Sequence, residues 1–347
     1  MNAQATLTAA GQNVAQESQS ARLPARQAPA QLRGAAETAL PRGSKLWIEV
    51  AESVAELQPH LAAWNQLAQD AADPNPFYEP WMLVPALEAF ATSGQVQLVM
   101  VYRDSRRTDS PPEMCGMFPM HLVRLGRWPF HTWRMWQHMY DYSCVPLVRR
   151  DCAEDTIRAV GHWIGTEARG ASLWDLHHLT TDGLFASSLL EVAREGGWLV
   201  HCADSYHRAL LRCEADPENY GSEAVTGRTR QEHRRLRRRL ADLGRLEVRS
   251  TDTDPDFSRW TARFLELEQS GWKGRGETAM ADSPDHRQYF ETIVAQGSAR
   301  GQVAMLGLFL NDEPVALKCN FLVPPGSYAF KIAFSEEHYR FSPGVQL

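Results

Sequence analysis

The chain has 347 residues, 44% of them hydrophobic and 22% charged, which is ordinary for a soluble protein and sufficient for two domains. Its formal net charge of −6 excludes a general attraction to nucleic acid, and no apolar run is long enough to span a bilayer. The six cysteines show neither C-x-x-C spacing nor a metal-ligand pattern, so we expect reduced thiols, no metal and a cytoplasmic protein.

The N-terminal segment, residues 1–44, has no charged start followed by an apolar core, so it does not match a secretory signal. It is rich in Ala, Gln, Ser, Pro and Arg and contains no aromatic residue, which predicts a disordered leader.

Residues 45–215 form the first predicted domain. "KLWIEV" predicts a strand, and apolar residues at helical spacing, from Leu61 to Leu67 and from Trp81 to Phe90, predict two helices. Two β-rich runs follow, "VQLVMVYR" and "EMCGMFPMHLV", and then a less regular aromatic stretch that ends in "CVPLV". After it we expect a helix near 153–168, the strand "SLWDLHHL", another helix and the strand "WLVHC".

Residues 216–244 contain the run "GRTRQEHRRLRRRLADLG", which predicts a connecting helix. Its arginines invite a nucleic-acid interpretation, but Leu236, Leu240 and Leu243 give it an apolar stripe. An amphipathic helix with a solvated basic face therefore fits better, and contact with an anionic acceptor, lipid phosphate or RNA is the alternative.

Residues 245–347 repeat the element order of the first domain. "RLEVRS" predicts a strand, and Asp254-Pro255 and Ser283-Pro284 each predict a helix start, with Gly297 as the stop of the second helix. Three strands are predicted next: "QVAMLGLFL", "PVALKCNFL" and "SYAFKIAFS". A last helix start at Ser342-Pro343 is followed by four residues, so we expect the second domain to be incomplete in this chain.

Strand, two helices, three antiparallel strands and a glycine-containing helix start is the order of a GNAT acyltransferase domain. The stretches "NPFYEPWM", "RQEHRRLRRRLADLG", "FLELEQSGWKGRGETA", "EPVALKCNF" and "FKIAFSEEHYRFSPGVQL" resemble acetyltransferases of the CelD/BcsL type, relatives of the Fem-like tandem-GNAT proteins. The resemblance implies an α/β (α+β) fold of two tandem GNAT-like domains with mixed, mainly antiparallel sheets. It departs at Phe334-Ser335, where the family more often shows Tyr-Asp.

The resemblance further implies acetyl-CoA or another acyl-CoA as donor. The pyrophosphate of coenzyme A would sit on backbone N–H groups at the last helix start, where the helix dipole favours an anion. The expected cofactor-binding residues are Phe330, Lys331, Ile332, Ser342, Gly344 and Val345. For Ser342, Gly344 and Val345, a capped helix start with no ligand is the structural alternative. The matching turn of the first domain holds Asp151, Glu154 and Asp155 and no glycine, so we expect the cofactor in the second domain.

The stretch "ELEQSGWKGRGETAM" at residues 266–280 supplies the expected acceptor-binding residues, Trp272, Lys273 and Arg275. Gly271 is predicted to end a helix in a left-handed cap with Trp272 folded back on it. Lys273 and Arg275 would then lie on a glycine-flexible loop and hold a phosphate or carboxylate of the acceptor, and a solvated loop is the alternative.

Acyl transfer to an amine or hydroxyl needs a base and stabilisation of an oxyanion. Glu266 and Glu268 are the candidate bases, although they lie on different faces of a helix and surface carboxylates are the alternative. Backbone N–H groups from Phe330 to Ala333 would stabilise the oxyanion, and the base could also lie outside this chain.

The sequence therefore predicts an acyl-CoA-dependent acyltransferase acting on a small-molecule or glycan-precursor acceptor, a sugar or envelope precursor. Two alternatives stay open: a Fem-like aminoacyl transferase that uses aminoacyl-tRNA, and a non-catalytic GNAT pair acting as a scaffold. We expect no nucleic-acid partner and no transmembrane segment, and oligomeric state is not predicted.

Overall fold

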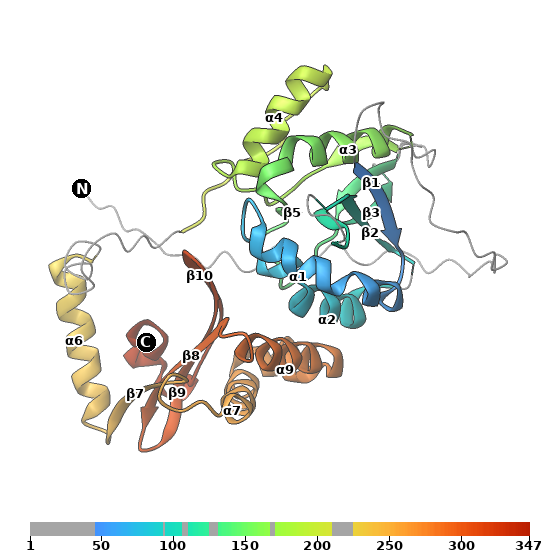
Figure 1. Ribbon diagram of the computed structural model, residues 1–347. Coiled ribbons are helices and arrows are strands. Elements are labelled where there is room, and N and C mark those ends of the chain that lie inside the picture. The colour runs from blue at the N-terminus through green and yellow to red at the C-terminus, as the bar shows by residue number, and fades with distance from the viewer. Residues whose placement is uncertain (1–45, 93, 106–109, 125–130, 167–170, 210–224) are drawn as a thin grey trace, which may run out of the picture. The chain divides into compact units, whose positions relative to one another are not determined.

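The structure is a computed structural model that describes residues 46–92, 94–105, 110–124, 131–166, 171–209 and 225–347 (Figure 1). The predicted leader at residues 1–44 lies outside the described residues, as do residues 210–224 before the connecting helix. Among the helices described, none is long and apolar enough to cross a membrane.

The first half is built on a sheet with strand order β1-β2-β3-β4-β6, on which β5 pairs with β3. Neighbouring strands are antiparallel except for β4 and β6, which run parallel. Helices α1 and α3 pack against this sheet. The strands are β1 (Leu46–Ala51), β2 (Val96–Arg103), β3 (Glu113–Arg124), β4 (His131–Met135), β5 (Leu147–Val148) and β6 (Ala171–Asp175).

The helices of the first half begin where the sequence offers capping chemistry. Asn75 accepts a hydrogen bond from Phe77 N, and Pro80 occupies the first turn of α2, where its missing N–H has no partner to lose. The helical segments are η1 (Val54–His60), α1 (Leu61–Asp70), η2 (Pro76–Tyr78), α2 (Pro80–Phe90), η3 (Arg150–Cys152), α3 (Ala153–Thr166) and α4 (Leu184–Gly196).

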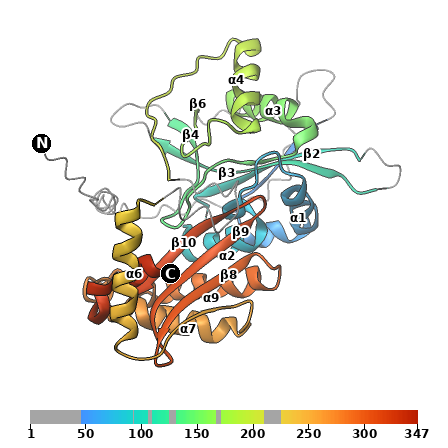
Figure 2. The ribbon, with the colours of Figure 1, turned by 90° about the vertical axis from the view of Figure 1, so that its left-hand side faces the viewer.

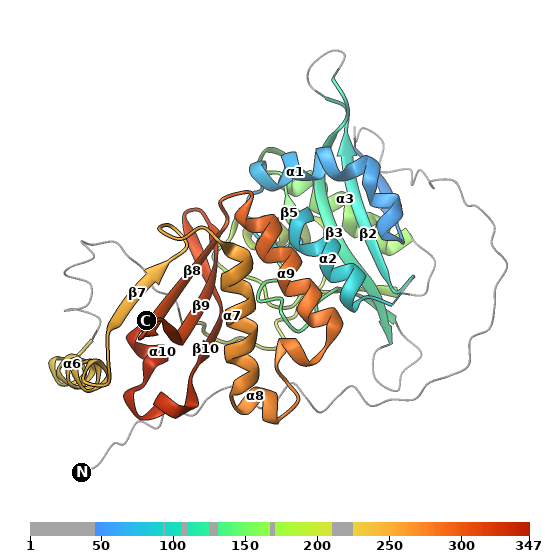
Figure 3. The same cartoon turned by 90° about the horizontal axis from the view of Figure 1, so that it is seen from below.

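The second half is built on an antiparallel sheet with strand order β10-β9-β8-β7. Figure 3 shows this sheet between α6 on one side and α7 with α9 on the other. The elements are α6 (Gly227–Ala241), β7 (Leu246–Ser250), α7 (Phe257–Ser270), α8 (Trp272–Arg275), η4 (Met280–Asp282), α9 (Pro284–Ser298), β8 (Val303–Leu310), β9 (Glu313–Val323), β10 (Gly326–Phe334), η5 (Glu336–Phe341) and α10 (Pro343–Gln346).

The predicted fold class, mixed α and β with two mainly antiparallel sheets, is confirmed. Each half shows the predicted order of a strand, two principal helices and an antiparallel meander. The core is continuous between the halves, because Trp81 of α2 packs edge-on against Phe321 of β9, with ring centroids 5.6 Å apart.

Several local predictions are wrong. "WLVHC" is not a strand, and β6 ends at Asp175, so it does not include His177 and His178. Helix α7 begins at Phe257 rather than after Asp254, because the side chain of Asp256 caps it by accepting from Arg259 N.

Gly297 does not stop α9, which continues to Ser298. A Cβ added at Gly297 would lie 2.5 Å from Val303 Cγ2 and 2.8 Å from the Trp81 ring. The glycine is therefore required for close packing of α9 against α2 and β8. The left-handed turn comes later, at Gly301 with a φ of +67°.

Candidate functional site

Strand β10 lies at the edge of the second-half sheet and carries a bulge at its centre. The register with β9 shifts between Ala329 and Lys331, which leaves Phe330 as the extra residue. The carbonyl of Phe330 accepts a 2.6 Å hydrogen bond from Tyr142 Oη of the first half, so it faces away from β9. The bulge therefore turns this carbonyl toward the first half.

The remainder of β10 presents further backbone groups at this edge. Ser335 N donates to Val315 O of β9 at 2.9 Å, and by alternation Ile332 and Phe334 direct their N–H groups away from β9. The side chains of Ile332 and Phe334 are 39% and 36% exposed. Donors at an open strand edge beside exposed apolar side chains suit an extended ligand with a carbonyl group.

The short helix α10 packs against this part of β10. A Cβ added at Gly344 would lie 3.2 Å from Ile332 Cδ1 and 3.6 Å from Phe334 Cδ1, so glycine permits the close approach. Ser342 precedes the helix in a left-handed conformation, with φ 52° and ψ 52°. Val345 is 62% exposed, and its N–H already donates to Ser342 O at 3.0 Å. Gly344 therefore supplies the first N–H of this turn, because Pro343 has none.

A buried carboxylate, Glu268 of α7, lies on the helix-covered side of the sheet. Its side chain is 1% exposed and both oxygens have partners: Lys273 Nζ donates to Oε1 at 2.6 Å, and Met280 N donates to Oε2 at 2.9 Å. Lys331 Nζ of β10 lies 4.0 Å from the same Oε1. Two ammonium groups and one carboxylate thus form a partly buried cluster with a surplus positive charge.

The first half contributes the aromatic wall of this cluster. Lys331 Nζ lies 4.6 Å from the ring centroid of Tyr140, a cation–π contact, and Tyr140 Oη lies 2.9 Å from Nδ1 of His286 in α9. Tyr142, two residues further on, holds the Phe330 carbonyl. Residues from both halves therefore surround the Lys331 ammonium.

Burial dominates the acid–base properties of this region. It lowers the pKa of Lys331 to about 8; the nearby Lys273 charge acts in the same direction, and the Glu268 carboxylate opposes both. Burial also lowers the pKa of His286 and raises that of Tyr140. Near neutral pH, Lys331 can therefore exchange a proton, whereas Tyr140 keeps its own.

A second buried polar group lies behind the tyrosines. His138 Nε2 is 2.7 Å from Asp141 Oδ1, with side chains only 4% and 0% exposed, although the ring N–H is not aligned for a hydrogen bond. Burial raises the pKa of Asp141, while His138 acts against that shift. Tyr289, stacked on Tyr140 at 5.8 Å, has a buried hydroxyl without a hydrogen-bond partner among the described residues.

No residue of the segment 138–142, "HMYDY", is among the site residues predicted from the sequence. The sequence feature that could have identified this segment is a histidine, an aspartate and two tyrosines within five residues, in a stretch without clear strand or helix periodicity. Such a concentration of polar aromatic and titratable side chains between regular elements is typical of a loop that contributes to a site.

The stretch around Gly271 differs from its prediction. Gly271 is extended, with φ −92° and ψ −164°, rather than left-handed, and Trp272 is 57% exposed rather than folded back on the helix. Residues 272–275 form the helical turn α8 instead of a flexible loop. Glu336 explains this: its carboxylate accepts from Trp272 N at 2.8 Å and from Arg275 Nη2 at 2.6 Å, which fixes the turn.

The structure brings five of the predicted site residues together in two places. Glu268, Lys273 and Lys331 form the buried cluster, and Ile332 and Gly344 meet where α10 packs on β10. Glu266 faces solvent on the other side of α7, and Arg275 is 64% exposed in its pair with Glu336. Among the described residues, no group of three or more His, Cys, Asp or Glu side chains is arranged to hold a metal ion.

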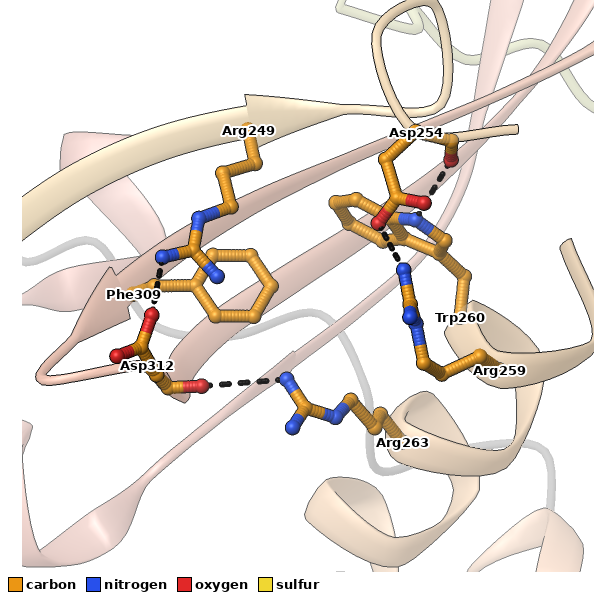
Figure 4. A pocket seen from close by; sticks show the side chains of 7 residues that line it. All are labelled: Arg249, Asp254, Arg259, Trp260, Arg263, Phe309 and Asp312. Carbon is orange, nitrogen blue, oxygen red and sulfur yellow. Dashed lines mark hydrogen bonds and ion pairs between the residues drawn. The ribbon is translucent and has the colours of Figure 1, made fainter. Parts of the chain in front are cut away.

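A pocket of about 170 Å³ lies at the opposite edge of the same sheet, by β7 (Figure 4). Its arginines are already occupied: Arg249 lies over the Phe309 ring and pairs with Asp312, and Arg259 pairs with Asp254. Because β7 and β10 are at opposite edges of the sheet, this pocket is separate from the β10 site. It is lined by Arg249, Asp254, Arg259, Trp260, Arg263, Phe309 and Asp312.

Comparisons with known proteins bear on the second half. Residues 227–347 match the family model described as "Acetyltransferase (GNAT) domain". The second half therefore contains a GNAT-type acetyltransferase domain. No curated protein matches the chain. Among solved structures, the crystal structure of FemX is similar, with 10% sequence identity, 82% of each chain covered and a TM-score of 0.48.

Proposed function

We propose that the chain is an acyl-CoA-dependent N- or O-acyltransferase of the CelD/BcsL type, acting on a sugar or cell-envelope precursor. The match of residues 227–347 to a GNAT acetyltransferase domain carries the proposal, because domains of this type use acyl-CoA.

The donor side of the proposed site is the open edge of β10 together with α10. Gly344 lets α10 pack closely on Ile332 and Phe334, so the start of the helix lies beside this edge. In this assignment the Gly344 N–H faces a phosphate, and Ser342 and Val345 border it. The N–H group of Ile332, at the sheet edge, faces the thioester carbonyl and stabilises the negative charge that develops on its oxygen.

The first half offers no comparable phosphate site at the matching position. Asp151 follows β5 at the entry to α3 and is paired with Arg103 at 2.9 Å and with Arg149 at 3.5 Å. Glu154 and Asp155 occupy the first turn of that helix. Carboxylates at the positive end of a helix repel a phosphate, which supports a single donor site in the second half.

The acceptor side is the cluster of Glu268, Lys273 and Lys331 beside Tyr140. A nucleophilic amine or hydroxyl must lose a proton as it attacks the thioester carbonyl and expels the thiolate of coenzyme A. Lys331 is the proton acceptor in this proposal, because its pKa of about 8 leaves a neutral fraction near pH 7. Glu268 stabilises the ammonium that results, and the Lys273 ammonium attracts an acceptor with a phosphate or carboxylate.

Thermal unfolding with and without acetyl-CoA tests the donor and its location. Ligand at a hundred times its Kd should stabilise the folded state by about 2.7 kcal/mol, a shift of several degrees in Tm. Gly344→Val should abolish the shift, because its side chain would push the start of α10 away from Ile332. Gly165→Val controls for glycine replacement, because a Cβ there has nothing within 4 Å.

The outcomes separate the proposal from its two alternatives. A shift retained in Gly344→Val places the donor elsewhere. A shift with aminoacyl-tRNA but not with acetyl-CoA supports aminoacyl transfer, and stabilisation by neither supports a non-catalytic scaffold. Transfer of a radiolabelled acetyl group to a panel of amino sugars and lipid-linked sugars then identifies the acceptor.

A further inference from the structure

Helix α6 concentrates positive charge on a chain that is acidic overall. Its fifteen residues, Gly227–Ala241, include seven arginines and one glutamate, whereas the whole chain has a formal net charge of −6. The glutamate, Glu232, is already paired with Arg235 at 2.6 Å. Four more arginines are exposed and make neither an ion pair nor a ring contact with any described residue; they are Arg228, Arg234, Arg237 and Arg238.

The apolar face of α6 is used within the protein itself. Leu240 is fully buried and Leu236 is 9% exposed, and Leu240 packs with Leu308, Leu310 and Phe341 in a small core. The helix is thereby fixed to the second-half sheet, beside which it runs in Figure 2. Because Leu236 and Leu240 are not free to enter a bilayer, α6 presents its polar, arginine-rich face to a partner.

We propose that α6 is a docking surface for an anionic lipid bilayer. The four unpaired arginines are complementary to lipid phosphates, and arginine binds phosphate oxygens bidentately. Leu243, two residues after the helix, is 48% exposed, and Val248 of β7 is 52% exposed. Exposed apolar side chains next to a basic surface suit the interface of a bilayer.

Single-stranded RNA is the competing polyanion, and the helix fits it less well. Proteins that bind single strands combine basic grooves with aromatic side chains on which the bases stack. α6 itself contains no Phe, Tyr or Trp, and its neighbour η5 exposes one such ring, Tyr339. The arginines therefore offer many phosphate contacts but few rings on which successive bases could stack.

Docking through α6 would bring the last residues of the chain close to the lipid surface. η5 packs against α6, and Gln346 Nε2 of α10 lies 3.5 Å from His233 O of α6. The docking inference does not depend on acyl transfer. If both hold, the acceptor meets the enzyme at the membrane.

Vesicle co-sedimentation of the full chain, without acyl donor, tests the inference. Vesicles containing about one third phosphatidylglycerol should bind the protein at about 0.1 M salt and release it at about 0.5 M, and phosphatidylcholine vesicles should not bind it. Each arginine near such a surface contributes about five-fold in binding, so Arg234→Gln with Arg238→Gln should weaken it about 25-fold.

The matched control removes two arginines from the first half that already have acidic partners, Arg158→Gln with Arg194→Gln. It changes the net charge equally and should leave vesicle binding within two-fold. Equal binding by wild type and the α6 double variant would overturn the inference, as would equal loss in both double variants. Binding to a single-stranded RNA oligonucleotide without binding to the anionic vesicles would assign α6 to RNA instead.

Discussion

Replacing Glu268 by glutamine keeps the size of the side chain and removes its charge. The substitution leaves the ammonium groups of Lys273, 2.6 Å away, and Lys331, 4.0 Å away, without their shared carboxylate. Removing one partner of a buried ion pair costs about 3–5 kcal/mol. Because the Lys273 side chain is 24% exposed and water can stabilise it in part, we expect the lower end, about 3 kcal/mol.

Thermal unfolding followed by circular dichroism measures this effect. At roughly 2 °C per kcal/mol for a folded unit of this size, Glu268→Gln should lower Tm by about 6 °C. Glu266→Gln, two residues earlier on the solvent side of α7, is the matched control and should change stability by less than about 0.5 kcal/mol. Equal shifts in the two variants, or a Tm for Glu268→Gln within about 1 °C of wild type, would refute the assignment of a buried charge cluster.

The double variant Glu268→Gln with Lys273→Met gives a further check. When both partners are neutral, no uncompensated charge remains between them, so the double variant should be more stable than Glu268→Gln alone. A double variant less stable than either single variant would show that packing, and not charge, explains the loss.

Three other predictions concern the β10 site and the junction of the halves. Tyr142→Phe removes the donor to the Phe330 carbonyl and should cost about 1–2 kcal/mol, measured by denaturant unfolding; an unchanged midpoint would contradict a hydrogen bond there. Gly297→Ala should cost about 1–3 kcal/mol through overpacking, whereas Gly165→Ala should be neutral or slightly stabilising, and equal Tm values would contradict the close packing. Burial lowers the pKa of Lys331 to about 8 in the folded state, so between pH 8 and pH 10 the unfolded chain binds the proton that the folded chain has lost. Unfolding free energy of wild type relative to Lys331→Met should therefore rise with pH in this window, by up to about 1.4 kcal/mol per pH unit, and a flat difference would contradict the shift.

Local sequence patterns determined most of the elements. The prolines at Pro80 and Pro284 mark the starts of two helices, because a proline in the first helical turn loses no hydrogen bond. Apolar runs placed β2 and β3 and the strands β8, β9 and β10, whereas β4, in a less regular aromatic stretch, was not predicted. The element order of the second half resembled that of a GNAT domain. These features depend on residues close together in the chain, which is why they could be predicted.

Contacts between distant residues decided what local patterns could not. Gly271 has the residue type of a left-handed cap, yet the carboxylate of Glu336, more than sixty residues away, holds the following turn as a helix. Gly297 has the position of a helix stop, yet it is a packing site for Trp81 of the other half.

The same distinction between local patterns and distant contacts applies to the candidate site. The sequence alone named Glu268, Lys273, Lys331 and Gly344 as separate candidates, and its residue types pointed to anion binding and acyl transfer. Only the tertiary structure selected Glu268 over Glu266 as the buried carboxylate, and only it brought Tyr140 and Tyr142 of the first half to β10. Burial and charge proximity set the pKa of Lys331, and both are properties of the folded arrangement that no single stretch of sequence contains.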